Sequence, residues 1–552
     1  MATLVSLAPI LVVAILLVGM RWPAAKAMPI AYLTAVVVAW TFWGVDANQV
    51  AAASLRGLMI TAQLLFIIFG AILLLNTLSE SGGLAVIRES FAFVSPDRRV
   101  QVIIIAWLFG SFIEGAAGFG TPAAVCVPLL VGLGFPALAA VIAGMMIQCT
   151  PVSFGAVGTP ILVGVNNGLK NQADVDAYMH SSGVESMPEL LSAIAGKVAL
   201  LHLAAGMLVP LLVVCVLTKF FGAKRSAKEG LAIWKFALFA ALAMTIPYAI
   251  VANFMGPLFP SLLGSLVGLA IVIPAARKGF LLPNGKPWDF PPRESWLEQW
   301  SGSREVVLEH AKQDLPLWKA WLPYLMIAAL LVITRLSHLG IGKHLKTVAT
   351  PEFKQVFGSN VTIGSFQFLY LPGAVFILVS LITVVLHRMN GKAVHRAVKR
   401  SGAMVFSASV ALVFSVPMVQ VFINSDGGTA GLASMPKELA ESVAAIAGNT
   451  WPAFSSLIGG LGAFVAGSNT ISNMTFSLFQ FNVAENIGAD PQWIVALQAV
   501  GGAAGNVICV HNVVTACAVV GLIGKEGNVI RVTVFLFLYY ILVAGILGLL
   551  LA

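Results

Sequence analysis

The chain has 552 residues, of which 59% belong to the hydrophobic set AVILMFWYC and 10% are charged, and its mean hydropathy is +0.93. A soluble protein of this length carries about a quarter of its residues as charged side chains. The composition therefore indicates an integral membrane protein and excludes nucleic-acid-binding proteins, secreted disulfide scaffolds and disordered proteins. The net charge of +9 is concentrated in a few loops, so it bears on topology. The five cysteines lie in apolar stretches with no CxxC pair, which is typical of core residues rather than of a metal or redox site.

Spanning helices are the first elements that the hydropathy predicts, because a bilayer requires about 20 mostly apolar residues. The stretches that qualify are roughly 3–20, 28–45, 58–78, 137–165, 198–218, 231–251, 254–275, 319–335, 366–387, 401–424, 492–523 and 531–551. No positive charge precedes the first stretch and Arg21 follows it, which predicts an N-terminus outside the cell. Residues 276–318 form a loop that we expect to be cytoplasmic and to contain an interfacial helix.

Two further apolar regions, 100–134 and 443–482, are too long for a single span and are broken by small and polar residues. We predict that each is a re-entrant helical hairpin, which enters and leaves the bilayer on the same side. Irregular backbone at membrane depth is stable only when it is buried in protein or lines a cavity. The spans 137–165 and 492–523 are also interrupted by polar residues, and we predict that both are broken helices.

Loop charges support this topology, because Lys and Arg gather on the cytoplasmic side. Loop 219–235 has five basic residues against one acidic residue, and loop 388–400 has five basic residues and no acidic one. Three other loops are net acidic: 164–197, 425–442 and 482–491. Basic loops inside and acidic loops outside agree with twelve spans, two hairpins and both termini outside. The exception is the net positive loop 336–362, which this scheme places outside.

The order of elements repeats within the chain. Ser79–Gly83 and Asn424–Gly428 each end a span, and Gly110–Gly115 resembles Gly462–Gly467 about as far downstream; a broken helix follows both. The predicted topology gives the two units opposite orientations, and such inverted repeats are typical of secondary transporters that bind substrate near the bilayer midplane. The expected parts are N-terminal spans 1–57, a first unit 58–218, linking spans 219–365 and a second unit 366–552.

Two titratable side chains lie in the interrupted segments. Glu114 is the only acidic residue inside an apolar segment, where a charged side chain costs about 2.5–3.5 kcal/mol on insertion scales. It is a candidate proton carrier, and a structural acid bonded to backbone N–H groups is the alternative. His511 is the only histidine within the repeat core, since the other seven are expected in loops or towards span ends. It is a second candidate for proton exchange or anion binding, with a hydrogen bond to a neighbouring helix as the alternative.

The interrupted segments contain no lysine or arginine, so an anionic substrate would bind to free N–H groups at helix N-termini. Glycine permits close approach to the backbone, and neutral side chains supply further hydrogen bonds. The candidate substrate-binding residues are Gly118, Gly120, Thr121, Ser153, Ser468, Asn469, Thr470, Asn473, Asn506 and Asn512. They suit a small hydroxylated monoanion better than a di- or tricarboxylate. For the serines and threonines, bonding to the preceding helical turn is the alternative role.

The run Phe-Ile-Glu-Gly-Ala-Ala-Gly-Phe-Gly-Thr-Pro at 112–122 closely resembles the signature of the bacterial lactate permease family. The stretch Pro-Val-Ser-Phe-Gly-Ala-Val-Gly-Thr-Pro-Ile-Leu-Val at 151–163 is similar to the family's second conserved stretch. The resemblance implies uptake of L-lactate, D-lactate and glycolate with protons across the inner membrane. It also implies membership of a wider group of ion transporters that are built from inverted repeats with re-entrant hairpins.

The resemblance bears on the coupling ion as well. In related dicarboxylate carriers, Ser-Asn-Thr triplets at the hairpin tips help to bind sodium and carboxylate, and Ser468-Asn469-Thr470 is similar to that triplet. The first hairpin has Ala116-Ala117-Gly118 at the corresponding place, which favours a proton over sodium as the coupled ion.

The sequence therefore predicts an all-α integral membrane protein with about 12 transmembrane helices and two re-entrant hairpins in two inverted repeats. Its expected function is import of small 2-hydroxymonocarboxylates by proton symport, with the lipid bilayer as its other partner and with no cofactor, metal or nucleic acid. A sodium-coupled carboxylate transporter and an anion channel are the alternatives. An intramembrane enzyme that uses Glu114 and His511 as an acid–base pair lacks a nucleophile motif. The oligomeric state stays open, a homodimer included.

Overall fold

The computed structural model describes residues 2–20, 22–92, 94–118, 120–302, 315–335, 339–348 and 350–552. Within these ranges, 11 helices are long and apolar enough to cross a membrane by length and composition. The strands of the same part are β1 (Glu352–Gln355) and β2 (Thr362–Ser365), which pair antiparallel. The protein is thus an all-α integral membrane protein, as the composition predicts.

The first half of the chain contains the N-terminal helices and the first interrupted segments. Residues 2–41 form α1 (Ala2–Ser6), α2 (Ala8–Ala14), the π-helical η1 (Ile15–Gly19) and α3 (Ala24–Thr41). Next come α4 (Ala47–Glu80), α5 (Gly83–Ala92), α6 (Arg98–Val102), the π-helical η2 (Ile103–Phe109), α7 (Gly110–Ala117) and α8 (Thr121–Gly132). They are followed by α9 (Ala137–Met146), the 3₁₀ turns η3 (Ile147–Cys149) and η4 (Pro151–Phe154), α10 (Gly155–Thr159), the π-helical η5 (Pro160–Val165), α11 (Asn166–Leu169), α12 (Ala173–Ser182), α13 (Met187–Gly206) and α14 (Val209–Phe221).

The second half of the chain begins with a linking part. The linking elements are α15 (Ala227–Leu231), α16 (Trp234–Met255), α17 (Pro260–Arg277), the 3₁₀ turns η6 (Arg293–Ser295) and η7 (Glu298–Trp300), α18 (Leu317–Arg335), α19 (Ile341–Thr347), β1 and β2. The last elements are α20 (Pro372–Leu386), α21 (Gly391–Ile423), α22 (Met435–Ala447), η9 (Gly448–Thr450), α23 (Pro452–Ala466), α24 (Asn469–Ile487), α25 (Pro491–Gly505), α26 (Val510–Val519) and α27 (Glu526–Leu551).

The long helices α4 and α21 pack against each other and run antiparallel. Near one end, Gln49 donates to the carbonyl of Asn424, and near the other end Glu80 binds Arg396 and Arg400 at 2.8 and 2.6 Å. Both helices are longer than the predicted spans 58–78 and 401–424. Because α4 begins at Ala47, Arg56 lies inside the helix rather than at its edge, where it is buried and donates to the carbonyl of Lys170.

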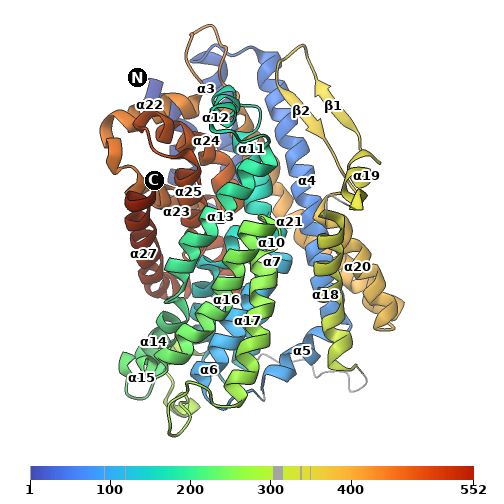
Figure 1. The fold of residues 1–552 in the computed structure, drawn as a ribbon, viewed down its shortest axis with the longest axis vertical. Helices are drawn as coiled ribbons and strands as arrows, with labels where there is room; N and C mark the ends of the chain where they lie inside the picture. Colours follow the sequence, from blue (N-terminus) through green and yellow to red (C-terminus); the bar gives the residue numbers. More distant parts are fainter. Residues whose placement is uncertain are drawn as a thin grey trace.

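The acidic loops gather at one end of the molecule and the basic loops at the other. Lys437 binds Asp174, and Lys197 and Tyr178 both reach Asp490, so the three acidic loops contact one another. At the opposite end lie α5, α6 and α15, at the bottom of Figure 1, while α12 and the strands are at the top. This separation is what the predicted topology requires.

Residues 98–134 fold back on themselves as a helical hairpin. A Cβ added at Gly134 would lie 3.3 Å from Nη2 of Arg98, and the Arg98 guanidinium lies 5.8 Å from the centre of the Phe135 ring. The start and the end of this segment are therefore adjacent. Its two arms meet at Gly118 and Gly120, and both of these glycines have positive φ angles, which disfavour other residues.

Residues 451–480 form a second helical hairpin from α23 and α24. The indole Nε1 of Trp451 donates to Oε1 of Gln480 at 2.8 Å, and the hydroxyl of Ser472 donates to the carbonyl of Gly459. The arms meet at Gly467 and Ser468. The adjacent ends of both hairpins agree with the proposed re-entrant path, which stays a prediction.

The predicted interfacial helix is wrong for the part of loop 276–318 that follows α17 and reaches residue 302. Only the single turns η6 and η7 occur there, and residues 303–314 lie outside the described part of the chain. Pro283, Pro287, Pro291 and Pro292 lack backbone N–H groups and prevent a continuous helix. The loop instead binds the base of the first hairpin, where Arg98 contacts the backbone of Trp288 and the carboxylate of Asp289.

Candidate functional site

The interrupted segments are the most enclosed parts of the fold. In residues 98–117, 151–169 and 491–519, between 83% and 100% of the most apolar stretch of 18 residues is buried. In the other long apolar helices the buried share of such a stretch is 56% or less. Close packing between α23 and α25 contributes to this enclosure, since a Cβ at Gly501 would overlap the carbonyl oxygen of Ser456. Small residues at helix contacts are how membrane helices approach closely.

The first broken helix changes direction at residues 156–158. Ala156, Val157 and Gly158 have φ angles of 42°, 55° and 76°, in the left-handed region. For a β-branched residue such as Val157 this conformation is strained, at about 1–3 kcal/mol. The Thr159 hydroxyl donates to the Ala156 carbonyl at 2.6 Å and closes the turn. Strain that packing maintains in this way is characteristic of binding sites.

The tip of the first hairpin lies against this break. A Cβ at Gly118 would lie 2.7 Å from Cβ of Ala156, so only glycine fits there. One turn before the tip, the carboxyl group of Glu114 lies against Gly155. Glu114 is only 3% exposed and its Oε2 has no hydrogen-bond partner. The structure thus places Glu114 beside the break of the other helix.

The second broken helix is interrupted between α25 and α26, and both hairpin tips contact the start of α26. A Cβ at Gly120 would lie 3.4 Å from Oδ1 of Asn512, and one at Gly467 would lie 3.7 Å from Cβ of His511. Asn512 is buried, whereas His511 is exposed. This exposure weakens the hypothesis that His511 holds a proton inside a sealed site.

The N-terminus of α24 is a helix end that no side chain caps. Ser468 at the N-cap makes no capping bond, and the first helical bond runs from the Ser472 N–H to the Ser468 carbonyl. The N–H groups of the three residues between them therefore have no intrahelical partner. Asn469 and Thr470 are 2% and 4% exposed. A buried, uncapped helix N-terminus of this kind favours an anion.

The N-terminus of α8 offers fewer free N–H groups to an anion than the N-terminus of α24 does. The N–H of Thr121 already donates to the Gly118 carbonyl at 3.0 Å, and Pro122 has no N–H. The Thr121 hydroxyl is buried without a partner and is the polar group that remains at this tip.

Side chains of both halves meet beside the N-terminus of α24. The Ser153 hydroxyl and the Asn469 amide donate to the same carbonyl, that of Ala499, at 3.1 and 3.3 Å. Asn473 donates to the Pro160 carbonyl at 3.1 Å. The Oδ1 atoms of Asn469 and Asn473 are buried without partners, and both lie near Gly502.

These residues define a central cluster of Ser153, Ser468, Asn469, Thr470 and Asn473. Thr470 belongs to it because its carbonyl lies against Gly164 of η5. Gly118, Gly120, Thr121 and Asn512 lie at the adjoining first tip, whereas Asn506 ends α25 with a buried Oδ1 that has no partner. No ion pair of the described residues involves any member of the cluster.

A buried chain of polar side chains, which the sequence does not predict, lies beside Ser153. His202 is fully buried in α13, with its Nε2 2.8 Å from the Ser153 hydroxyl and its Nδ1 2.5 Å from the Tyr540 hydroxyl. The Tyr540 hydroxyl also lies 2.9 Å from the Thr150 hydroxyl. The expectation that His202 lies towards a span end is therefore wrong: α13 continues almost directly into α14, which leaves His202 near the middle of a 35-residue apolar stretch.

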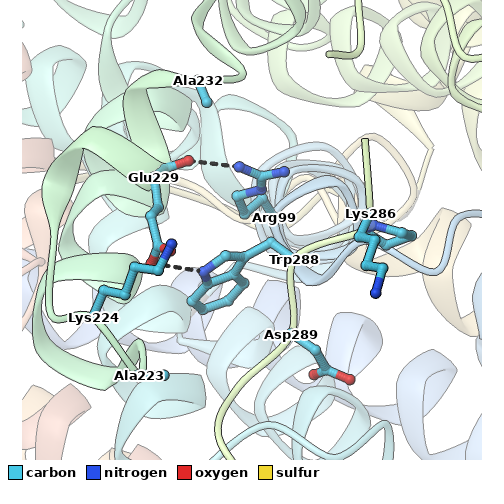
Figure 2. A pocket seen from close by; sticks show the side chains of 9 residues that line it. Arg99, Ala223, Lys224, Glu229, Ala232, Lys286, Trp288 and Asp289 are labelled. Atoms are coloured by element: carbon cyan, nitrogen blue, oxygen red, sulfur yellow. Dashed lines mark hydrogen bonds and ion pairs between the residues drawn. The ribbon is translucent and has the colours of Figure 1, made fainter. Parts of the chain in front are cut away.

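A surface pocket of about 340 Å³ lies elsewhere, at the base of the first hairpin. Figure 2 shows Arg99, Lys224 and Glu229 around Trp288, whose indole donates to Glu229 at 3.0 Å. Arg99 is already bonded to Asp97 and to the carbonyl of Glu229. The pocket thus contains paired charges from the basic end of the molecule and none of the candidate residues.

Comparison with known proteins agrees with this architecture. The family model for L-lactate permease matches residues 2–552. A putative L-lactate permease of Haemophilus influenzae is 31% identical, with 87% of this chain and 85% of the relative covered. The L-lactate permease of Bacillus subtilis is 26% identical over 87% and 83%, and the glycolate permease GlcA of Escherichia coli is 26% identical over 100% and 95%. The chain is a multi-pass membrane protein that belongs to the L-lactate permease family.

Proposed function

We propose that this protein imports small 2-hydroxymonocarboxylates, L-lactate first and D-lactate and glycolate beside it, by proton symport across a bacterial inner membrane. Family membership and the names of the relatives support a lactate or glycolate transporter. The observation that carries the proposal is the buried, uncapped N-terminus of α24 next to amide oxygens without partners.

The substrate fits this arrangement group by group. Its carboxylate binds to the free N–H groups at the start of α24, because the helix dipole is positive there. Its 2-hydroxyl donates to Oδ1 of Asn469 or Asn473, which satisfies a buried acceptor that is otherwise costly to leave unpaired. The Thr121 hydroxyl and the Asn506 and Asn512 amides border the site from the other segments.

Neutral donors explain the preference for a monoanion. Each further carboxylate of a di- or tricarboxylate would require compensation for burial of a second charge. The central cluster contains no Lys or Arg side chain that provides it. The same absence means that the protein supplies no fixed positive charge for the single carboxylate, so a cation that enters with the substrate stabilises it.

A proton is the favoured cation because titratable side chains border the cluster, among them Glu114 beside Gly155. Sodium is the second candidate, since the unpaired amide oxygens of Asn469 and Asn473 are also suitable sodium ligands. The first hairpin lacks the Ser-Asn-Thr triplet of the second, which favours the proton.

Alternating access follows from two units, 58–218 and 366–552, in opposite orientation. The antiparallel helices α4 and α21 contain the corresponding spans 58–78 and 401–424 of the two units and support this inverted relationship. We infer that the re-entrant hairpins and the broken helices move as one body against the remaining spans, which changes the side from which the cluster is reached.

Uptake by purified protein in liposomes tests the proposal. A symporter of one anion with one proton accumulates lactate about tenfold per unit of imposed pH gradient and is insensitive to membrane potential. Initial rates are compared with protein-free liposomes, because lactic acid itself crosses bilayers. Glycolate should compete with lactate, whereas citrate should not. Flux that requires sodium would favour the second candidate, and voltage-driven flux without proton movement would indicate a channel.

A further inference from the structure

We propose that His202 binds the coupling proton and that Ser153 links this proton to the substrate site. The inference rests on the proposed proton symport and names the residue that performs it. It starts from the buried chain of hydrogen bonds that joins Ser153, His202, Tyr540 and Thr150.

The hydrogen bonds at Ser153 determine one protonation state of the chain. The Ser153 hydroxyl has a single hydrogen, which it donates to the Ala499 carbonyl. Nε2 of His202 therefore carries a hydrogen and donates to the Ser153 oxygen. In the neutral ring, Nδ1 is then an acceptor, so the Tyr540 hydroxyl donates to it. The Thr150 hydroxyl completes this state by donating to the Tyr540 oxygen.

The same contacts accommodate one additional proton. With both ring nitrogens protonated, Nδ1 donates to the Tyr540 oxygen, and Tyr540 turns its hydrogen to the Thr150 oxygen. Thr150 then donates to Sγ of Cys149, which lies 3.8 Å away. The thiol of Cys149 donates to the carbonyl of Met146 in both states. Only hydroxyl hydrogens rotate, so the chain accepts a proton without displacement of its heavy atoms.

The surroundings of His202 make the charged state depend on the substrate. The titratable groups that face it are Tyr540 of α27 and Tyr248 of α16, whose ring lies at 5.9 Å, with Cys149 beyond Thr150. No ion pair of the described residues involves His202, and its side chain is fully buried. An imidazolium here lacks a counter-charge until an anion arrives.

Substrate binding supplies that counter-charge. Ser153 contacts His202 on one side and shares the Ala499 carbonyl with Asn469 of the central cluster on the other. A carboxylate at the start of α24 therefore attracts a proton onto His202 through a low-dielectric interior, and a proton on His202 attracts the carboxylate. Each ligand increases the affinity for the other by the same factor, which is the thermodynamic condition for symport.

The test uses His202→Gln, which retains a donor and an acceptor but has no titratable group. We expect pH-driven lactate accumulation in liposomes to fall about tenfold or more, whereas lactate counterflow persists. Tyr540→Phe removes the hydroxyl that exchanges roles with Nδ1, and it should shift the pH profile of uptake. Tyr539→Phe is the matched control, because the Tyr539 hydroxyl bonds to the Ala205 carbonyl outside the chain.

Wild-type pH-driven accumulation by His202→Gln would overturn the inference while the proposed symport stands. The inference would also be overturned if Glu114→Gln or His511→Gln lost pH-driven accumulation while His202→Gln retained it. If wild-type protein shows no pH-driven uptake, the proposed symport itself fails. Should His202→Gln not fold, an unchanged pH profile in Tyr540→Phe is the overturning result.

Discussion

Ser153 and Asn469 donate to one carbonyl oxygen, that of Ala499, although the two residues are distant in the chain. Ser153 belongs to the first broken helix and Asn469 to the tip of the second hairpin. A single backbone acceptor thus joins the interrupted segments of the two halves. Because both donors are neutral, they orient groups around the site without adding charge to it.

Gly118→Ala tests whether the first tip must contact the first break. The new methyl group would lie 2.7 Å from Cβ of Ala156 at a φ angle of +64°. We expect uptake to be lost because the tip can no longer reach residues 156–158. Gly183→Ala is the control: its φ angle is +73° and nothing lies within 4 Å, so it should cost about 1 kcal/mol and leave uptake intact. Equal uptake by both variants would show that this contact is dispensable.

Gly501→Ala should destabilise the packing of α23 on α25. Its methyl group would overlap the carbonyl oxygen of Ser456, and overpacking of this kind typically costs about 1–3 kcal/mol. The measurement is the melting temperature of the purified protein in detergent. Gly402→Ala in α21 has open space around it and should leave the melting temperature unchanged or raise it. A melting temperature of Gly501→Ala equal to that of wild type would contradict the close packing.

Glu80→Gln should weaken the contact between α4 and the start of α21. The Glu80 side chain is 7% exposed and binds two arginines that are 53% and 60% exposed. Solvent screens the arginines, so we expect a loss of about 1 kcal/mol, seen as a lower melting temperature. Glu294→Gln in an exposed turn is the control and should change nothing. No difference between the two variants would mean that these ion pairs do not hold the helices together.

The sequence predicts where the helices are interrupted better than it predicts which residues contact those interruptions. Glycine and proline at 118, 120 and 122 break a helix wherever it lies, so the tip is visible from composition alone. That α24 rather than α8 presents free N–H groups depends on the bond from Thr121 to Gly118, which only the folded backbone shows. His202 was missed because its partners, Ser153 and Tyr540, are distant in the chain. A histidine within an apolar stretch was the available signal.

Equilibrium binding of L-lactate to the purified protein tests the central claim, that the two halves form one substrate site. Ser153→Ala removes the hydroxyl that links the site to His202, and Asn469→Ala removes the amide oxygen proposed to accept from the 2-hydroxyl. Each should weaken binding about tenfold or more, since a hydrogen bond in a charged site contributes about 1.5–3 kcal/mol. Asn167→Ala, which loses only a bond to the Val163 carbonyl of its own helix, should bind as wild type does. Wild-type affinity in either Ser153→Ala or Asn469→Ala would contradict a site shared between the halves.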